Sequence, residues 1–404
     1  MTNRVVITGI GPVSSIGTGK DIFFRNLLDL KLNISEIFSE FKGYKYKSRF
    51  VSPMPEFSLE DMNIPSSIYK ILQDEDKLTL KSAKLALDDA HIDLKEISEC
   101  SIILGTGFSG LQRAFESYLV HIGVDEKRFH RMIIPQTMPN SVAAWLSIIF
   151  KIKGSSFTIN ASCASGTIAI GEAYLKIKNG NDKIIITGGV ECLKDKHGAI
   201  RRGFDVLDTL TKDENGVPYP FSKNRSGFLF NEGAACILIL ENLDNAIIRK
   251  ADIYAEITDY KSNSDSFNIV QIEPSGESIK NLLISIINKK KIDYINTHGT
   301  GTIPNDEVES RIIREIFGNK NNQPFLNSSK GILGHTLGAS GAFETAITAL
   351  SIKESKLHPN NIPEPMENLN LIPEKTESII HNAITTSYGF GGHNAALFLK
   401  RIEL

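Results

Sequence analysis

Cys163 is the residue in this sequence whose type and setting most clearly suit covalent chemistry. It stands among small residues in the stretch INASCASG, where a short β-prone run stops and a helix is expected to begin. The small neighbours leave room for a substrate, and a helix N-terminus stabilises a thiolate and lowers the cysteine pKa. Cys163 is therefore a candidate nucleophile for acyl transfer. Taken alone, Cys163 is better interpreted as a buried structural cysteine, which is the more common role of a free thiol.

Three further stretches place a titratable residue beside glycines at the end of an expected strand. They are NTHGTGT with His298, SSKGILGH with Lys330 and His335, and GFGGHN with His393. One such histidine is more often a turn residue than a catalyst, and glycine clusters usually serve turns. Together with the cysteine turn, however, these stretches favour one shared catalytic site.

Strands, glycine turns and helices alternate along the chain, which is typical of an α/β protein with a parallel or mixed sheet. Apolar helices are expected over residues 141–150 and from residue 164 to about 178, and the second is apolar or small almost all round, which indicates burial. The run GIGPVSS near the N-terminus resembles a dinucleotide-binding loop, but Pro12 and Ser14 interrupt the pattern. We interpret its glycines as a tight turn and expect no cofactor.

A polar, charged segment at residues 241–251 predicts a boundary, which divides the chain into residues 1–245 and 246–404. The second half echoes the first. Residues 293–301 are similar to the strand and glycine turn of residues 5–11, and residues 325–354 are similar to the strand, turn and helix around Cys163. Few residues are identical, but the order of elements matches, so an internal duplication is the simplest explanation.

Composition narrows the class of protein. The chain is 41% hydrophobic and 23% charged with a net charge of −2, so nothing indicates a nucleic-acid partner. Its four cysteines are scattered, which argues against disulfides or a metal site and indicates a reducing compartment. The N-terminus lacks a signal sequence, and the longest apolar run, residues 142–150, is too short to span a bilayer. We expect a cytoplasmic protein.

These motifs together resemble the elongating β-ketoacyl-ACP synthases of type II fatty-acid and polyketide pathways, within the thiolase superfamily. The resemblance covers essentially the whole chain, from VVITGIGPVSSIG to TTSYGFGGHNAALFL, and its carriers are INASCASG, NTHGTGT and SSKGILGHTLGASGA. It implies a thiolase-like five-layered α-β-α-β-α fold built from two duplicated halves. It also implies a decarboxylative Claisen condensation between an acyl group on Cys163 and malonyl-ACP.

The resemblance further implies roles for individual residues. His298 and His335, as neutral imidazoles, would donate N–H to the enolate oxygen that develops as malonyl loses carbon dioxide. Lys330 is counted with this catalytic set and would shape the electrostatics around the histidines. The remaining supporting positions are Glu344, Phe390 (whose backbone N–H would form an oxyanion hole with that of Cys163, and whose ring would act as a gate), Gly391 and Gly392.

Alternatives from other classes stay open at this stage. A chain-length factor, the partner subunit of a heterodimeric ketosynthase, usually lacks the nucleophile that Cys163 supplies. Thiolases carry a second cysteine near the C-terminus, but no cysteine follows Cys236. A thioester hydrolase could use the same cysteine and histidines to activate water.

The resemblance implies an acyl carrier protein as partner, and a dimer with an identical chain or with a nucleophile-free chain-length factor. The apolar residues 141–150 and the preceding residues 132–138 are expected at the dimer interface. The helix that often offers basic residues to the carrier instead opens on Asp74-Glu75-Asp76, with Arg201, Arg202, Lys223 and Arg225 as alternative contacts. These departures, with His393 where many relatives have threonine, favour a specialised polyketide or polyene pathway.

Overall fold

The computed structural model describes residues 3–125 and 127–403, and its central feature is one eleven-stranded mixed sheet. The order is symmetric about the antiparallel pair β12–β1, because on both sides two antiparallel pairings are followed by two parallel ones. β2 (Gly17–Thr18) pairs with β1 beside this path. The strands in spatial order are β14 (Phe325–Asn327), β13 (Tyr294–Asn296), β17 (Asn382–Gly389), β18 (His393–Lys400), β12 (Ala255–Ser264), β1 (Val5–Ser14), β11 (Gly233–Asn242), β9 (Ile184–Cys192), β7 (Ser101–Gly105) and β8 (Ser156–Ile159).

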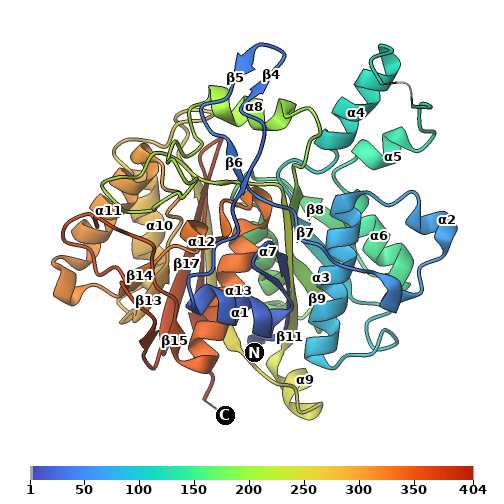
Figure 1. Ribbon diagram of the computed structural model, residues 1–404. Coiled ribbons are helices and arrows are strands. Elements are labelled where there is room, and N and C mark those ends of the chain that lie inside the picture. Colours follow the sequence, from blue (N-terminus) through green and yellow to red (C-terminus); the bar gives the residue numbers. More distant parts are fainter. Residues whose placement is uncertain (1–2, 126, 404) are drawn as a thin grey trace.

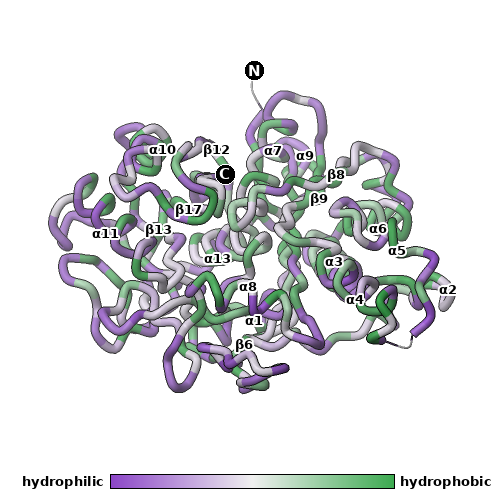
Figure 2. The backbone as a smooth tube through the Cα atoms, turned by 90° about the horizontal axis from the view of Figure 1, so that it is seen from above, coloured by the Kyte–Doolittle hydropathy of each residue, from purple (hydrophilic) through white to green (hydrophobic). Residues whose placement is uncertain are grey.

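We call the two halves of this sheet its arms: one runs from β14 to β12 and the other from β1 to β8. Helices cover the outside of both arms, and further helices fill the space between them, which gives the expected five layers (Figure 1). Figure 2 shows α13 near the middle, with α10 and α11 on one side and α3 and α6 on the other. The helices of these layers are α7 (Ser165–Lys178) and α13 (Ser340–Glu354) in the centre, α3 (Asp74–Ala90) and α6 (Ser141–Phe150) outside one arm, and α10 (Glu277–Ile287) and α11 (Ile303–Phe317) outside the other.

The two central helices are buried because their sequences are small or apolar on nearly every side. In α13 every residue from the first to Ile352 is buried. A β-carbon at Gly341 would lie 1.9 Å from the Thr167 hydroxyl of α7, and one at Gly166 would lie 3.0 Å from the backbone of α13. Glycine at these two positions therefore lets α7 and α13 approach closely, and this contact positions the cysteine turn.

One expectation about glycines proves wrong. The glycines near the N-terminus do not form a turn: β1 continues through them, and a β-carbon at Gly11 would lie 2.0 Å from the Ser82 carbonyl of α3. Gly188 and Gly189 likewise lie inside a strand, β9. Both pairs of glycines serve close packing, which the sequence pattern alone does not distinguish from a turn.

The duplication is present in the sheet, but one of its correspondences differs from the expectation. By position in the symmetric order, β12 corresponds to β1, whereas β13 corresponds to β7. The strand and glycine turn of residues 293–301 therefore do not mirror residues 5–11. The second correspondence holds, since β14 and α13 occupy the places that β8 and α7 occupy in the first half.

Within residues 3–125 and 127–403, no helix has both the length and the apolar character needed to cross a membrane.

Shorter elements connect these layers. The remaining elements are α1 (Lys20–Leu28), β3 (Ser35–Glu36), β4 (Glu40–Phe41), β5 (Tyr44–Lys45), β6 (Phe50–Ser52), η1 (Glu60–Met62), α2 (Ser66–Tyr69), α4 (Leu111–His121), α5 (Ile133–Thr137), α8 (Ala199–Val206), β10 (Phe230–Asn231), α9 (Leu243–Ile248), η2 (Lys320–Asn322), α12 (Lys330–Leu333), η3 (Leu337–Ala339), β15 (Lys356–Leu357) and β16 (Thr376–Glu377).

Candidate active site

A cavity of about 870 Å³ brings together residues from widely separated parts of the chain. Cys163, His298, His335 and Phe390 all line it. Cys163 follows β8 in one half of the sheet, and His298 follows β13 in the other. These two strands run in opposite directions, because five antiparallel pairings separate them, and the contact of α7 with α13 between the two halves brings their turns together. The cavity thus contains one nucleophile, two imidazoles and a backbone amide.

The cysteine sits on a strained turn that the following helix secures. Ser162 adopts φ +53°, a conformation that a non-glycine residue rarely takes and that here turns the chain sharply before Cys163. The Ser165 hydroxyl accepts a hydrogen bond from the Ala161 N–H at 2.9 Å and donates one to the Ser162 carbonyl at 2.6 Å. A β-carbon at Gly389 would lie 2.8 Å from the Ala161 carbonyl, so only glycine lets that loop come so close to the turn.

The expected lowering of the Cys163 pKa is wrong for this state of the protein. Helix α7 begins at Ser165, two residues after the cysteine, and burial raises the pKa of the Cys163 thiol to about 11. Hydrogen bonds from the Ser162 side chain and the Phe390 backbone N–H, and the positive charge of Lys330, lower the pKa only in part. In the free protein the sulfur is therefore a thiol, and its proton must leave when substrate arrives.

His335 is held in one tautomer. Its Nδ1 accepts a hydrogen bond from the Leu337 N–H at 3.2 Å and lies 2.9 Å from the Ser340 hydroxyl. A backbone N–H can only donate, so Nδ1 carries no proton. Burial, with the charge of Lys330, holds the pKa of His335 well below its usual value, and the ring is neutral. The ring proton is therefore on Nε2, where it can be donated.

His298 is fixed through its backbone. Glu309 accepts hydrogen bonds from the N–H groups of His298 and Gly299 at 2.9 and 2.8 Å, and Lys330 donates to the His298 carbonyl at 2.6 Å. Burial, followed by the charge of Lys330, also holds the pKa of His298 well below its usual value. Its Nδ1 has no hydrogen-bond partner among the described residues, so no contact there selects a tautomer. The two rings lie 5.7 Å apart and nearly perpendicular.

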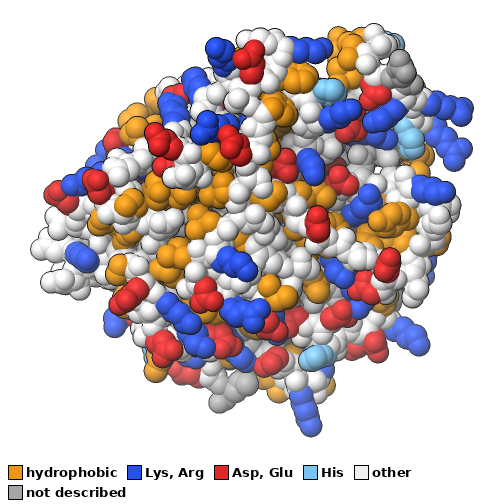
Figure 3. Space-filling model, in the orientation of Figure 1, with side chains coloured by type: hydrophobic (Ala, Val, Ile, Leu, Met, Phe, Trp, Pro, Cys, Tyr) orange, Lys and Arg blue, Asp and Glu red, His pale blue; other side chains and the backbone are white. Residues whose placement is uncertain are grey.

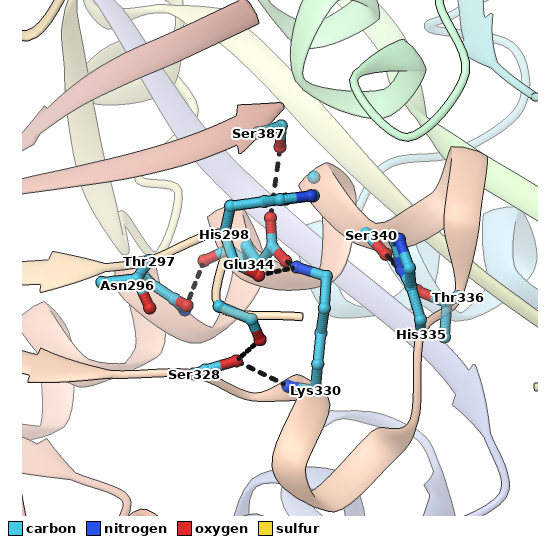
Figure 4. A network of polar contacts seen from close by, with 12 residues as sticks. Asn296, Thr297, His298, Ser328, Lys330, His335, Thr336, Ser340, Glu344 and Ser387 are labelled. Carbon is cyan, nitrogen blue, oxygen red and sulfur yellow. Dashed lines mark hydrogen bonds and ion pairs between the residues drawn. The ribbon is translucent and has the colours of Figure 1, made fainter. Parts of the chain in front are cut away.

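Lys330 and Glu344 lie beneath this pair and do not line the cavity (Figure 4). Their side chains form an ion pair in which both are almost completely buried, and Ser387 donates to the other Glu344 oxygen at 3.2 Å. This arrangement places Lys330 against the backbone of His298, away from any bound substrate. This position suits the electrostatic support implied for Lys330. It does not bring the Lys330 ammonium group into contact with the reacting atoms.

Gly391 and Gly392 form the turn between β17 and β18 and also lie outside the cavity wall. Both have positive φ, at 83° and 74°, which favours glycine. The Gly391 N–H donates to the Ile269 carbonyl at 2.8 Å, and the Gly392 carbonyl accepts from the Asp265 N–H at 2.9 Å. These bonds tie the Phe390 loop to the segment over residues 265–269.

Sequence reasoning missed several residues of the site. Tyr388 packs its ring on His298 at 5.4 Å, and Phe228 packs on His335 at 5.0 Å. Glu309 could have been predicted from the sequence. It lies in the helix that follows the NTHGTGT stretch, where its side chain can reach back to the backbone N–H groups of that stretch. Nothing in the sequence marks the aromatic residues, which look like ordinary core.

Several charged residues that bear on carrier docking are buried in the structure. Glu75 and Asp76 are buried, and Asp76 accepts hydrogen bonds at the start of α3 from the Gln73 N–H and from Ser141. Arg201 is buried as well, so it is no surface contact. On the face shown in Figure 3, basic and acidic side chains are interspersed, without a patch of one sign.

Comparison with known proteins defines the family. Residues 2–245 match the description "Beta-ketoacyl synthase, N-terminal domain", and residues 254–362 match its C-terminal domain. The chain belongs to the β-ketoacyl synthase family. It is 31% identical to the 3-oxoacyl-[acyl-carrier-protein] synthase 2 of Staphylococcus aureus strain COL over 413 residues, which cover 99% of each protein.

Solved ketosynthases share the fold of this synthase. The ishigamide ketosynthase/chain length factor superposes with a TM-score of 0.89 at 25% identity, and both chains are covered completely. A type II polyketide synthase ketosynthase in complex with its acyl-carrier protein superposes with a TM-score of 0.88 at 24% identity, again over both whole chains. The thiolase-like fold expected from the motifs is confirmed.

The accessibility of the thiol leads to a first prediction. Cys163 lines the cavity, whereas Cys100, Cys192 and Cys236 lie in other packed regions, so iodoacetamide should label Cys163 first. Because only the thiolate reacts and the pKa is raised to about 11, labelling should accelerate about tenfold per pH unit between neutral pH and that value. Peptide mapping after brief treatment measures this, and first labelling of another cysteine would contradict the site.

Proposed function

We propose that this synthase elongates a carrier-bound acyl chain by decarboxylative condensation with malonyl-ACP. The observation that carries the proposal is the shared cavity, which is lined both by Cys163 and by His335, a histidine whose proton is fixed on Nε2. A thiol alone would suit many reactions. A buried neutral N–H donor beside it suits the stabilisation of an enolate.

The reaction would begin with acyl transfer to the cysteine. The Cys163 thiol loses its proton, the sulfur attacks the acyl thioester, and the bond from the acyl carbon to the carrier sulfur breaks as the carrier thiol leaves with a proton. His298 is the ring that suits receipt of the proton, because no hydrogen bond at Nδ1 selects its tautomer. The backbone N–H of Phe390, which already donates a hydrogen bond to the Cys163 sulfur, would help to stabilise the oxyanion of the acyl carbonyl.

Condensation would follow on the malonyl group. The bond to its carboxylate breaks and releases carbon dioxide, and the electron pair passes to the thioester as an enolate. The N–H groups of His335 and His298 would stabilise the enolate oxygen. The enolate carbon then attacks the acyl carbonyl, the bond to sulfur breaks, and Cys163 leaves as a thiolate that takes up a proton from solvent to regenerate the thiol. Lys330 and Glu344 hold the His298 backbone throughout.

A product assay tests this proposal directly. The purified chain, acyl carrier protein and malonyl-ACP would be offered starters of several lengths, and the carrier-bound products would be weighed by mass spectrometry. A β-ketoacyl product two carbons longer supports the proposal. Free fatty acid in its place would instead identify a thioester hydrolase, and no product without an added sister subunit would favour a chain-length-setting role.

The proposal also includes the pathway and the division of the chain. The departures noted in the carrier-docking helix and at His393 favour a specialised type II polyketide or polyene pathway over primary fatty-acid synthesis, and the product assay distinguishes the two by chain type. Residues 1–245 and 246–404 are proposed as the two halves, which the symmetry of the sheet about β1 and β12 supports.

A second prediction concerns assembly, as a homodimer or with a chain-length factor. Large hydrophobic side chains are exposed on α5, at its C-cap and on α6, namely Ile134, Met138 and Ile148, and β8 is the last strand of its sheet. An exposed sheet edge with apolar neighbours favours a paired state. Light scattering should therefore give the mass of a dimer. A dilute monomer with full activity would contradict it.

A further inference from the structure

Helix α8 lies below a short hairpin, β4 and β5, at the top of the molecule (Figure 1), and its residue Phe204 lines the active-site cavity. Residues four apart in a helix share a face. Ile200 and Phe204 therefore lie on one side of α8, and Arg201 and Asp205 on another. All four are buried, so both sides of this short helix are packed.

The first side of α8 forms part of the wall around the nucleophile. Phe204 lines the cavity and belongs to the same hydrophobic cluster as Cys163. Its ring is the centre of an aromatic group, with centroids 5.8 Å from Phe108 and 5.9 Å from both Phe228 and Phe230. Phe204 and Phe228 line the cavity, so an acyl chain on Cys163 would pack against these two rings, and the position of Phe204 would affect the length that fits.

The other side of α8 holds an arginine in an aromatic enclosure. The Arg201 guanidinium lies 3.7 Å from the ring centroid of Tyr46 and 4.6 Å from that of Phe38. It donates hydrogen bonds to the carbonyls of Ser48 at 3.1 Å and Phe38 at 2.8 Å. Only 2% of Arg201 is exposed, so these contacts replace water almost entirely.

Asp205, one turn further along the same side, is held by the same segment. It accepts hydrogen bonds from the Tyr44 hydroxyl at 2.8 Å, the Lys47 N–H at 3.1 Å and the Ser48 N–H at 3.0 Å. Only 1% of Asp205 is exposed. We call residues 38–48 the clasp, because every one of these contacts to Arg201 and Asp205 comes from this segment.

We propose that the clasp sets the acyl-chain preference of the enzyme by fixing α8, and that Arg201 and Asp205 are positioning residues for Phe204. Moving α8 outward to admit a longer chain would leave a buried guanidinium and a buried carboxylate without their partners, which is costly. The acyl chain must therefore fit the wall as the clasp holds it. This inference rests on the proposed function, since it assumes that Cys163 carries an acyl chain.

The test loosens the clasp without touching the cavity. Tyr44→Phe removes one hydrogen bond to Asp205 and keeps the ring, and Arg201→Lys keeps the charge and loses the planar stack. Lys45→Ala is the control, because Lys45 is exposed on the same hairpin. Acyl-enzyme formation is measured by mass spectrometry with acetyl, octanoyl and dodecanoyl thioesters, and thermal unfolding is measured alongside. Malonyl decarboxylation is measured separately, since it needs the histidines and not the acyl wall.

Both clasp variants should raise the rate of dodecanoyl relative to acetyl transfer by about tenfold, a typical discrimination for a small change in an apolar pocket. Phe204→Leu should shift the ratio in the same direction, whereas Lys45→Ala should not shift it. An unchanged ratio in folded clasp variants overturns the proposal, and so does an equal fall in acylation and decarboxylation, which indicates general damage. If the parent protein forms no acyl-enzyme at all, the proposed function itself fails.

Discussion

His298→Ala and His335→Ala should each stop condensation while leaving acyl transfer to Cys163 measurable. Each replacement removes an imidazole whose pKa burial holds well below the usual value, and hence a neutral N–H donor for the enolate. The loss of one such donor typically costs about 100- to 1,000-fold in rate. Acyl transfer relies on the sulfur and the backbone N–H of Phe390, which neither change removes. His298→Ala also removes the ring that would receive the thiol proton, so its acyl transfer should be slower but still measurable. Carbon dioxide release from malonyl-ACP and formation of labelled acyl-enzyme measure the two half-reactions.

Cys163→Gln provides the matched control for this pair. The glutamine amide occupies the space where an acyl carbonyl would lie, so condensation should be abolished while decarboxylation continues. His335→Ala should have at least as large an effect as His298→Ala, because only His335 has its donor proton fixed on Nε2 by a backbone contact. If both histidine variants released carbon dioxide at the parent rate, the roles assigned to the rings would be wrong.

The sequence predicted which residues meet, because each lies where a strand ends in a glycine-rich turn. Cys163 follows β8 and His298 follows β13, and both turns open on the same cavity. The buried helices were predicted from their lack of a polar face, and their contact joins the two halves that carry these turns. For this class of fold, the glycine-rich turns and the small-residue helices carry much of the information about the site.

What the sequence could not show was the consequence of burial. A position near a helix N-terminus suggested a lowered pKa for Cys163, but the depth of the sulfur decides the sign and raises it. The glycines of β1 looked like a turn because the helix that packs against them, α3, is distant in sequence. The clasp was invisible for the same reason, since Arg201 finds its partners more than 150 residues away.

Lys330→Ala should destabilise the protein by about 3–5 kcal/mol, the usual cost of leaving one member of a buried ion pair without its partner. Glu344 is then left almost fully buried, with Ser387 as its remaining side-chain contact. The His298 carbonyl also loses its hydrogen bond from Lys330, so condensation should fall together with stability. Chemical denaturation of the parent and the variant gives the two free energies of unfolding.

The pH dependence of this loss identifies its cause. Burial raises the pKa of Glu344, and Lys330 opposes that rise, so removing Lys330 raises the pKa further. A carboxyl whose folded-state pKa is raised stabilises the folded protein at low pH and loses that stabilisation as the pH rises through the folded value. The deficit of Lys330→Ala should therefore be smaller at about pH 5 than at about pH 8, and Lys330→Ala combined with Glu344→Gln should remove most of this pH dependence. A deficit that stayed constant with pH would mean that lost packing, and not the unpaired carboxylate, causes the destabilisation.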